Sequence, residues 1–309
     1  MFGHFLKSAV AYKFELGEGE TITEDKLKQF VPLLKHVDIK PAQKESFGFS
    51  SVVGYHDPER FFHKVGTWYL LSLTVEDKKI KKNKLDRRVA EKKRELAQAK
   101  SIELSALSKQ ESQQVRDKVL SEMLSEQEAD ENYLNIIIDT DNRWLFFSDS
   151  STRTIKKFTG LMQKHYSSFR VSEFCTQGID LHLTSWLYNP DESLPEEIDL
   201  EDSASLQSEQ SAKATLKKQN LQSDEVATLI NHGKKCLELS ISYFQRVSFR
   251  LTSTCQLKGI KLSDDLIADV AEIEDPQSRV EELEPFWEVM CSEITSIYQW
   301  LDELQNKPV

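Results

Sequence analysis

The chain has 309 residues, of which 39% are hydrophobic and 29% are charged, which is ordinary for a globular protein with room for two or three cores. Its four cysteines are widely spaced without a CxxC motif, which indicates reduced thiols and neither a disulfide framework nor a cysteine zinc site. No apolar run approaches the length of a membrane span, which argues against a membrane-spanning protein. The net charge of −11 argues against a nucleic-acid partner unless the cations are separated from the acids along the chain.

The first region, residues 1–77, predicts a mixture of helices and strands. Apolar and polar or small residues alternate over Val10–Phe14, which is typical of a half-buried strand. A helix is expected over Thr23–Leu34, where apolar residues recur at helical spacing. A second strand is expected over Thr67–Val75, after a stretch rich in glycine and proline.

Residues 78–128 differ sharply in composition and predict a helical arm. From Lys78 to Arg94 there are ten Lys or Arg against Asp86 and Glu91, so the local charge is 10 − 2 = +8. Helix-forming residues dominate and the apolar stripe is thin, so we predict two long helices that project from the body and need a partner to bury their apolar face. Such a run either binds a phosphate backbone or forms a solvated face that keeps the arm soluble. The arm residues that we select as DNA-binding candidates are Lys81, Lys82, Arg87 and Arg88.

Residues 129–188 return to a pattern with strands. Leu134–Asp139 and Arg143–Ser148 predict a hairpin, because the Asp-Thr-Asp-Asn between them is favourable turn chemistry. A helix over Ser151–His165 and two strands are expected next, the second marked by alternation over Ile179–Leu183. Together with residues 1–77 this region predicts one discontinuous α+β body, interrupted by the arm.

The rest of the chain predicts a linker and a separate C-terminal region. Residues 189–221 read as an acidic linker, since Asn189–Glu209 contains two prolines, several serines and eight acidic residues without a basic one. Residues 222–309 predict a helix over Ser223–Phe244, a hairpin over Val247–Leu262 and a long amphipathic helix at the end. Asp264–Glu303 holds thirteen acidic residues against one arginine. The negative charge is therefore concentrated away from the basic arm, so the negative net charge does not exclude DNA as a partner.

A second group of cations lies around the expected start of the C-terminal region. Lys217, Lys218 and the amide of Gln219 precede an expected helix N-cap at Ser223 and could meet phosphates together. A loop that is merely basic is the alternative. Further along, Arg246, Ser248 and Arg250 are expected to share one face of a strand. The DNA-binding candidates outside the arm are therefore Lys217, Lys218, Gln219, Lys234, Lys235, Arg246 and Arg250.

Catalytic patterns are weak. Asp139 and Asp141 could hold Mg²⁺ together with a third acid such as Glu173, as in a nuclease, but they lie in the expected turn, where aspartate is favoured for backbone reasons. The seven histidines form no HxH or HExxH motif, and no serine or cysteine stands in a nucleophile elbow. We therefore predict a protein that is not an enzyme, with no metal and no cofactor. A Mg²⁺-dependent nuclease and an acidic interaction protein or DNA mimic that binds no DNA remain alternatives.

Several stretches together resemble the RdgC family of recombination-associated proteins over nearly the whole chain. Leu216–Val226 (LKKQNLQSDEV) resembles the family's KKQ segment, and Ile241–Leu266 resembles the hairpin that follows it. Ile179–Leu187 (IDLHLTSWL) resembles a family strand that ends in T-x-W. Phe5–Phe14 and Gly48–Gly54 match the opening strand and a glycine-flanked aromatic stretch.

The resemblance implies a curved subunit that pairs head to head in a ring-shaped homodimer around double-stranded DNA. Family members bind DNA without sequence preference and limit the access of the RecA recombinase to it. The arm would form one interface of the ring, the C-terminal region the other, and the KKQ segment would lie near the hole. A cytoplasmic, nucleoid-associated protein is expected, since Met1–Phe14 is too polar and too short for a secretory signal. Leu124–Tyr133 departs from the family, because it is acidic where the family commonly carries an aromatic and basic Leu-Pro-Arg-Ala-Phe segment.

Overall fold

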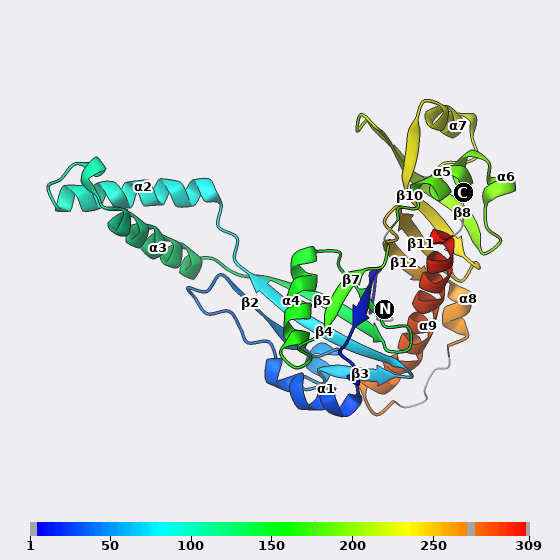
Figure 1. The fold of residues 1–309 in the computed structure, drawn as a ribbon, viewed down its shortest axis with the longest axis horizontal. Coiled ribbons are helices and arrows are strands. Elements are labelled where there is room, and N and C mark those ends of the chain that lie inside the picture. Colours follow the sequence, from blue (N-terminus) through cyan, green and yellow to red (C-terminus); the bar gives the residue numbers. More distant parts are fainter. Residues whose placement is uncertain (1–4, 176, 271–275, 307–309) are drawn as a thin grey trace. The chain divides into compact units, whose positions relative to one another are not determined.

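The computed structural model describes residues 5–175, 177–270 and 276–306 (Figure 1). It combines helices with a large antiparallel sheet, as expected for an α+β protein. The chain divides into two compact units. The first unit comprises Met1–Leu33, Ser50–Ser72 and Leu134–Val309, and the second comprises Leu34–Phe49 and Leu73–Tyr133.

The first unit is built on antiparallel strands. They are hydrogen-bonded in the order β6-β1-β12-β11-β10-β8-β9, with β7 also paired to β1 and β3 paired to β4. Alternation fixes which face is buried: in β11 Val247, Phe249 and Leu251 are buried while Arg250 is exposed. The strands are β1 (Ser8–Glu15), β3 (Phe62–Val65), β4 (Trp68–Asp77), β5 (Asp130–Asp139), β6 (Trp144–Phe147), β7 (Arg170–Glu173), β8 (Ile198–Ser208), β9 (Lys213–Leu216), β10 (Lys234–Tyr243), β11 (Val247–Thr252) and β12 (Leu257–Leu262), of which β4 and β5 each continue into the second unit.

One long helix supplies much of the core of the first unit. Helix α9 (Arg279–Gln305) lies beside β11 and β12 (Figure 1) and buries apolar residues along most of its length, as its amphipathic pattern predicts. Its Tyr298 hydroxyl is fully buried, 2.9 Å from the carbonyl oxygen of Ala9 and 3.0 Å from that of Cys255. The other helices are α1 (Glu24–Phe30), α4 (Thr152–Gln163), α5 (Asp180–Tyr188), α6 (Pro190–Ser193), α7 (Asp224–Asn231) and α8 (Asp264–Ala268), with 3₁₀ turns at Pro32–Leu34 and Gly54–His56. None of the helices in the described ranges is both long and apolar enough to cross a membrane.

The second unit contains the two predicted arm helices, α2 (Lys82–Ala99) and α3 (Lys109–Glu126), together with β2 (Glu45–Ser50) and a 3₁₀ turn at Leu104–Ala106. Their shared core is small, and Leu85, Val89, Val119 and Met123 form it. A capping box starts α3: Ser108 Oγ accepts from the Glu111 backbone N–H, and the Glu111 carboxylate accepts from the backbone N–H of Ser108. Hydrogen bonds from Lys100 and from Ser108 lower the pKa of Glu111 to about 2.

The first cation of the basic run has a structural role. Lys78 is buried, and its Nζ donates to the carbonyl oxygens of Pro41 at 2.8 Å and Leu124 at 2.9 Å. A buried amine needs such acceptors, because an unpaired one is costly. Lys78 therefore ties the loop before β2 to the end of α3 and does not contribute to a cationic surface.

The expected strand over Ile179–Leu187 was wrong, since this segment forms helix α5. The residues that are buried are Ile179, Leu183, Trp186 and Leu187, at helical spacing, whereas Leu181 is 53% exposed. The strict alternation over Ile179–Leu183 therefore coincided with a helical pattern that continues past it.

Two further expectations were also wrong. Asn189–Glu209 is not a linker, because it contains α6 and the whole of the long strand β8. The helix expected over Ser223–Phe244 ends at Asn231, and Gly233, with φ of +79°, leads into strand β10. β8 and β10 pair with two register shifts, which interrupt the alternation by which a strand is recognised in sequence.

Candidate nucleic-acid interface

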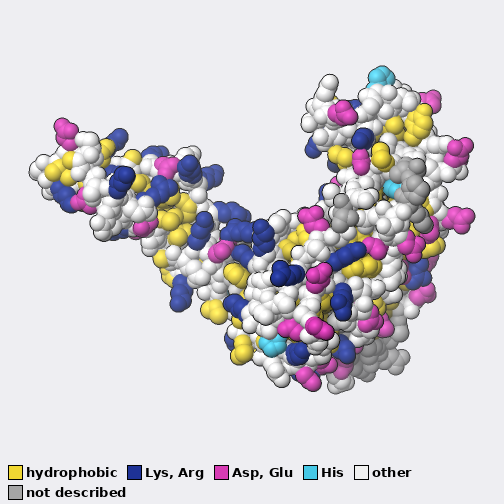
Figure 2. Space-filling model, in the orientation of Figure 1, with side chains coloured by type: hydrophobic (Ala, Val, Ile, Leu, Met, Phe, Trp, Pro, Cys, Tyr) yellow, Lys and Arg dark blue, Asp and Glu magenta, His cyan; other side chains and the backbone are white. Residues whose placement is uncertain are grey.

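A basic hollow lies on the second unit. Lys79, Lys81, Lys84, Arg87 and Arg88 line a cavity of about 420 Å³, in which Glu126 is the one acid, so its lining carries a charge of 5 − 1 = +4. Four of these cations stand at helical spacing around the first turns of α2 and so share one face. Figure 2 shows Lys and Arg side chains gathered over α2. We call this set of five cations and Glu126 the helix hollow.

The cations of the helix hollow differ in whether a carboxylate of the same chain already pairs with them. Arg88 is 2.8 Å from Glu126, and Lys79 is 2.9 Å from Asp130, whose carboxylate raises the pKa of that amine. Lys81 and Lys84 are exposed and form no ion pair within the described residues. The two free amines and the weakly paired Arg87, 3.9 Å from Glu91, are thus available to an anionic ligand.

The helix hollow only partly matches the arm candidates chosen from the sequence. It brings together Lys81, Arg87 and Arg88, whereas Lys82 is exposed elsewhere on α2. Lys79 and Lys84 were missed, although the spacing of three residues from Lys81 to Lys84 and on to Arg87 was a usable signal.

A second, smaller hollow lies on the first unit. Lys217, Lys218 and Arg250 line a cavity of about 200 Å³ together with two acids, Asp202 and Glu238. We call it the strand hollow, because β8, β9, β10 and β11 supply most of its walls. Lys217 and Lys218 are exposed and form no ion pair within the described residues, whereas Arg250 is 3.1 Å from Glu238.

The loop that carries the two lysines is fixed by its backbone. Lys218 has φ of +53°, in the left-handed region, and the backbone N–H of Gln219 donates to the Asp202 carbonyl oxygen at 3.3 Å. Gln219 therefore anchors the loop to β8 through its main chain. The structure thus brings three of the seven sequence candidates, Lys217, Lys218 and Arg250, into one hollow.

The remaining candidates are bound to other parts of the first unit. Arg246 lies in the turn before β11, not on the strand, and it binds Glu293 of α9 with Nε 2.9 Å from Oε1; this carboxylate raises the pKa of Arg246. The expectation that Arg246 and Arg250 share a strand face was therefore wrong. Lys234 Nζ donates to the Ala212 carbonyl oxygen at 2.8 Å, and Lys235 lies 3.5 Å from Asp180.

Of the two acids considered for a nuclease site, Asp139 stabilises the turn in which Asp141 lies. Asp139 is buried, and its carboxylate accepts from the backbone N–H groups of Asp141 and Asn142, both at 3.1 Å, and from the Asn142 side chain at 2.8 Å. Thr295 Oγ1 is a further partner at 3.3 Å. This is the side chain-to-backbone pattern for which aspartate is favoured in turns.

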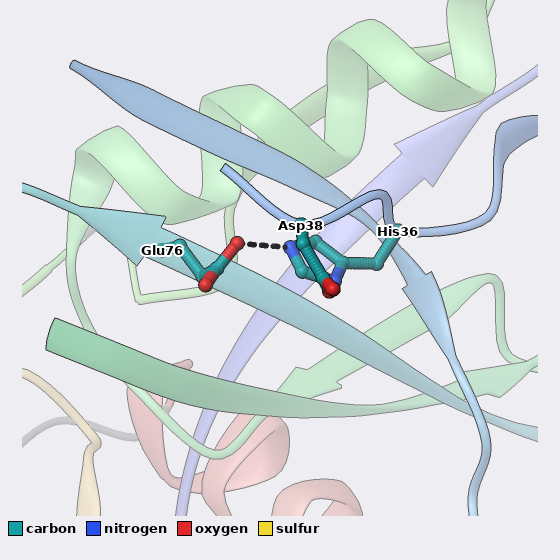
Figure 3. A group of neighbouring side chains, drawn as sticks. All are labelled: His36, Asp38 and Glu76. Atoms are coloured by element: carbon teal, nitrogen blue, oxygen red, sulfur yellow. Dashed lines mark ion pairs between the residues drawn. The ribbon is translucent and has the colours of Figure 1, made fainter. Parts of the chain in front are cut away.

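Three side chains within the described ranges could hold a metal ion together: His36, Asp38 and Glu76, whose ligand atoms all lie within 4.8 Å of one another (Figure 3). Asp139, Asp141 and Glu173 do not form such a group there. Sequence reasoning missed the cluster because His36 and Asp38 form no known motif and Glu76 lies on another element, β4.

Comparison with known proteins relates the chain to one family along its length. A family model described as "Putative exonuclease, RdgC" matches residues 4–306. A recombination-associated protein RdgC of Pasteurella multocida is 28% identical over 250 residues, covering 79% of this chain and 79% of that protein. A protein of the same name from Shewanella denitrificans is 26% identical over 266 residues, covering 83% of this chain and 84% of its own length.

Proposed function

The chain belongs to the RdgC family, and from this premise we propose that it binds double-stranded DNA without sequence preference. The observation that carries the proposal is the convergence of exposed cations in the helix hollow and the strand hollow of a chain whose net charge is −11. Lys and Arg on a surface release counterions from the phosphate backbone, which gives affinity but reads no bases.

The proposal includes an encircling homodimer that limits the access of the RecA recombinase to DNA. The helix pair of the second unit supports an additional interface, because its own core is small and Ile102 and Leu104 at the α2–α3 connection are 38% and 50% exposed. In a ring, cations of both subunits would face the same duplex. The chain is proposed to act by occupying DNA and not as an enzyme.

Replacing Lys217 and Lys218 together with alanine is expected to weaken duplex binding roughly 10- to 100-fold at about 0.1 M salt, and to reduce the slope of log K against log salt by about 2. The physical reason is the removal of two free amines, each of which would displace a counterion. The measurement is fluorescence anisotropy of a labelled duplex over a salt series.

The matched control is Lys234→Ala/Lys235→Ala, which removes the same charge from a pair already bound to Ala212 and Asp180. It is expected to change the affinity by less than about threefold. Equal weakening in both variants would contradict a specific role for the strand hollow. Absence of binding by the unmodified chain at low salt would overturn the proposal and favour an acidic interaction protein.

A further inference from the structure

A histidine and two carboxylates meet on the second unit in the arrangement of a metal site. His36 Nε2 is 3.0 Å from Glu76 Oε2, and the ligand atoms of His36, Asp38 and Glu76 all lie within 4.8 Å of one another. His36 and Asp38 come from the loop before β2, and they face Glu76 of β4 (Figure 3). We propose that these three side chains bind one divalent first-row transition-metal ion.

The loop that carries His36 is held in place by its backbone. The His36 N–H donates to the Phe49 carbonyl oxygen at 2.7 Å, and the Ile39 N–H donates to Glu76 Oε2 at 2.8 Å. Gly48 makes this approach feasible, because a Cβ at that position would lie 2.5 Å from the His36 backbone nitrogen. The backbone that carries His36 is therefore held beside Glu76 before an ion arrives.

The imidazole and the Glu76 carboxylate are close without forming a good hydrogen bond. His36 Nε2 is buried and has no hydrogen-bond partner, although Glu76 Oε2 is only 3.0 Å away, so the ring nitrogen points beside the oxygen and not at it. The two side chains are 12% and 15% exposed. A metal ion bound by both His36 Nε2 and Glu76 Oε2 would explain why the two atoms are close without a hydrogen bond, since a neutral imidazole coordinates a metal through the lone pair of that nitrogen.

The charge of the cluster also favours a cation. Neither Asp38 nor Glu76 forms an ion pair with a Lys or Arg in the part of the chain that the structure describes, so two carboxylates with oxygens within 4.8 Å of each other lack a neutralising basic side chain. In a tetrahedral site with metal–ligand distances of about 2.1 Å, neighbouring ligand atoms stand about 3.4 Å apart. Small shifts of the three side chains would bring their ligand atoms to this separation.

The ligand set limits which ion fits. One imidazole and two carboxylates suit Zn²⁺ or Mn²⁺ better than Mg²⁺, which prefers oxygen ligands in an octahedral arrangement. Asp38 is exposed, so a bound ion would keep a side toward solvent, where water completes its coordination. The site is independent of both hollows, whose linings do not include these three residues.

The test is titration of the full chain with Zn²⁺ by calorimetry and with Co²⁺ by visible absorption, each in an excess of Mg²⁺. We expect one equivalent to bind, with the absorption of a cobalt ion held by nitrogen and oxygen ligands. His36→Gln and Asp38→Asn are each expected to weaken binding at least about 10-fold. Asp38 is exposed, so its conservative replacement by an amide should leave the fold intact and keeps the test valid if His36→Gln fails to fold.

The matched control is His63→Gln. His63 Nε2 is also buried without a hydrogen-bond partner and lies 3.6 Å from Glu284, but it does not belong to a three-ligand group in the described ranges. This variant is expected to bind the ion like the unmodified chain. Lack of binding by the unmodified chain, unchanged binding by Asp38→Asn, or full displacement by Mg²⁺ would each overturn the proposal.

Discussion

Replacing Lys81, Lys84 and Arg87 together with glutamine is expected to weaken binding to duplex DNA roughly 100-fold or more at about 0.1 M salt. These residues line the helix hollow and have no ion pair or only a weak one within the described residues, so each is free to displace a counterion. The slope of log K against log salt should fall by about 2 to 3, roughly one for each cation that no longer neutralises a phosphate. Anisotropy of a labelled duplex measures both quantities.

The control for this variant removes the same charge from another part of the second unit. Lys35, Lys40 and Lys44 are exposed and form no ion pair within the described residues, and their triple glutamine variant has the same net charge as the helix-hollow variant. Its affinity is expected to fall less than about fivefold, through the long-range field alone. If the two variants weaken binding equally, net charge and not the helix hollow governs binding.

The variant Trp287→Ala is expected to lower the free energy of unfolding by about 3–5 kcal/mol. Trp287 is 2% exposed on α9, and its ring contacts Phe5 at 5.9 Å and His63 at 5.4 Å between centroids. Removing it leaves a cavity where α9 meets the N-terminal segment and β3, which the surrounding core fills only in part. Urea unfolding followed by circular dichroism measures the change.

The comparison for Trp287→Ala is Tyr55→Ala, which removes an aromatic side chain that is 86% exposed. Its unfolding free energy should stay within about 0.5 kcal/mol of the unmodified chain. A decrease of less than about 1 kcal/mol in Trp287→Ala would show that α9 is not a principal element of the core.

Patterns that are local in sequence predicted the fold well. The hairpin of β5 and β6 was predicted because Asp139 and its neighbours form a turn whose chemistry is contained in four residues. The helices α2 and α3 were predicted because helix-forming residues dominate their sequence, and α9 was predicted because its apolar spacing persists over several turns. The acidic strand β8 was missed because it carries acids on its accessible positions and pairs irregularly with β10.

The candidate sites were predicted less completely, because they are formed by tertiary contacts. Lys217 and Arg250 meet only because β9 and β11 belong to one sheet, and no sequence spacing encodes that meeting. Nor does any spacing indicate that Glu293 binds Arg246. For the same reason the cluster of His36, Asp38 and Glu76 was not predicted, since it depends on how the loop before β2 is held against β4.

The affinity of the unmodified chain for two unrelated duplexes of equal length, measured across a salt series, tests the proposed DNA binding most directly. The proposal predicts that log K falls linearly with log salt with a slope steeper than about −3, and that the two sequences bind equally within about threefold. Binding that is insensitive to salt, strong preference for one sequence, or no binding at low salt would contradict it.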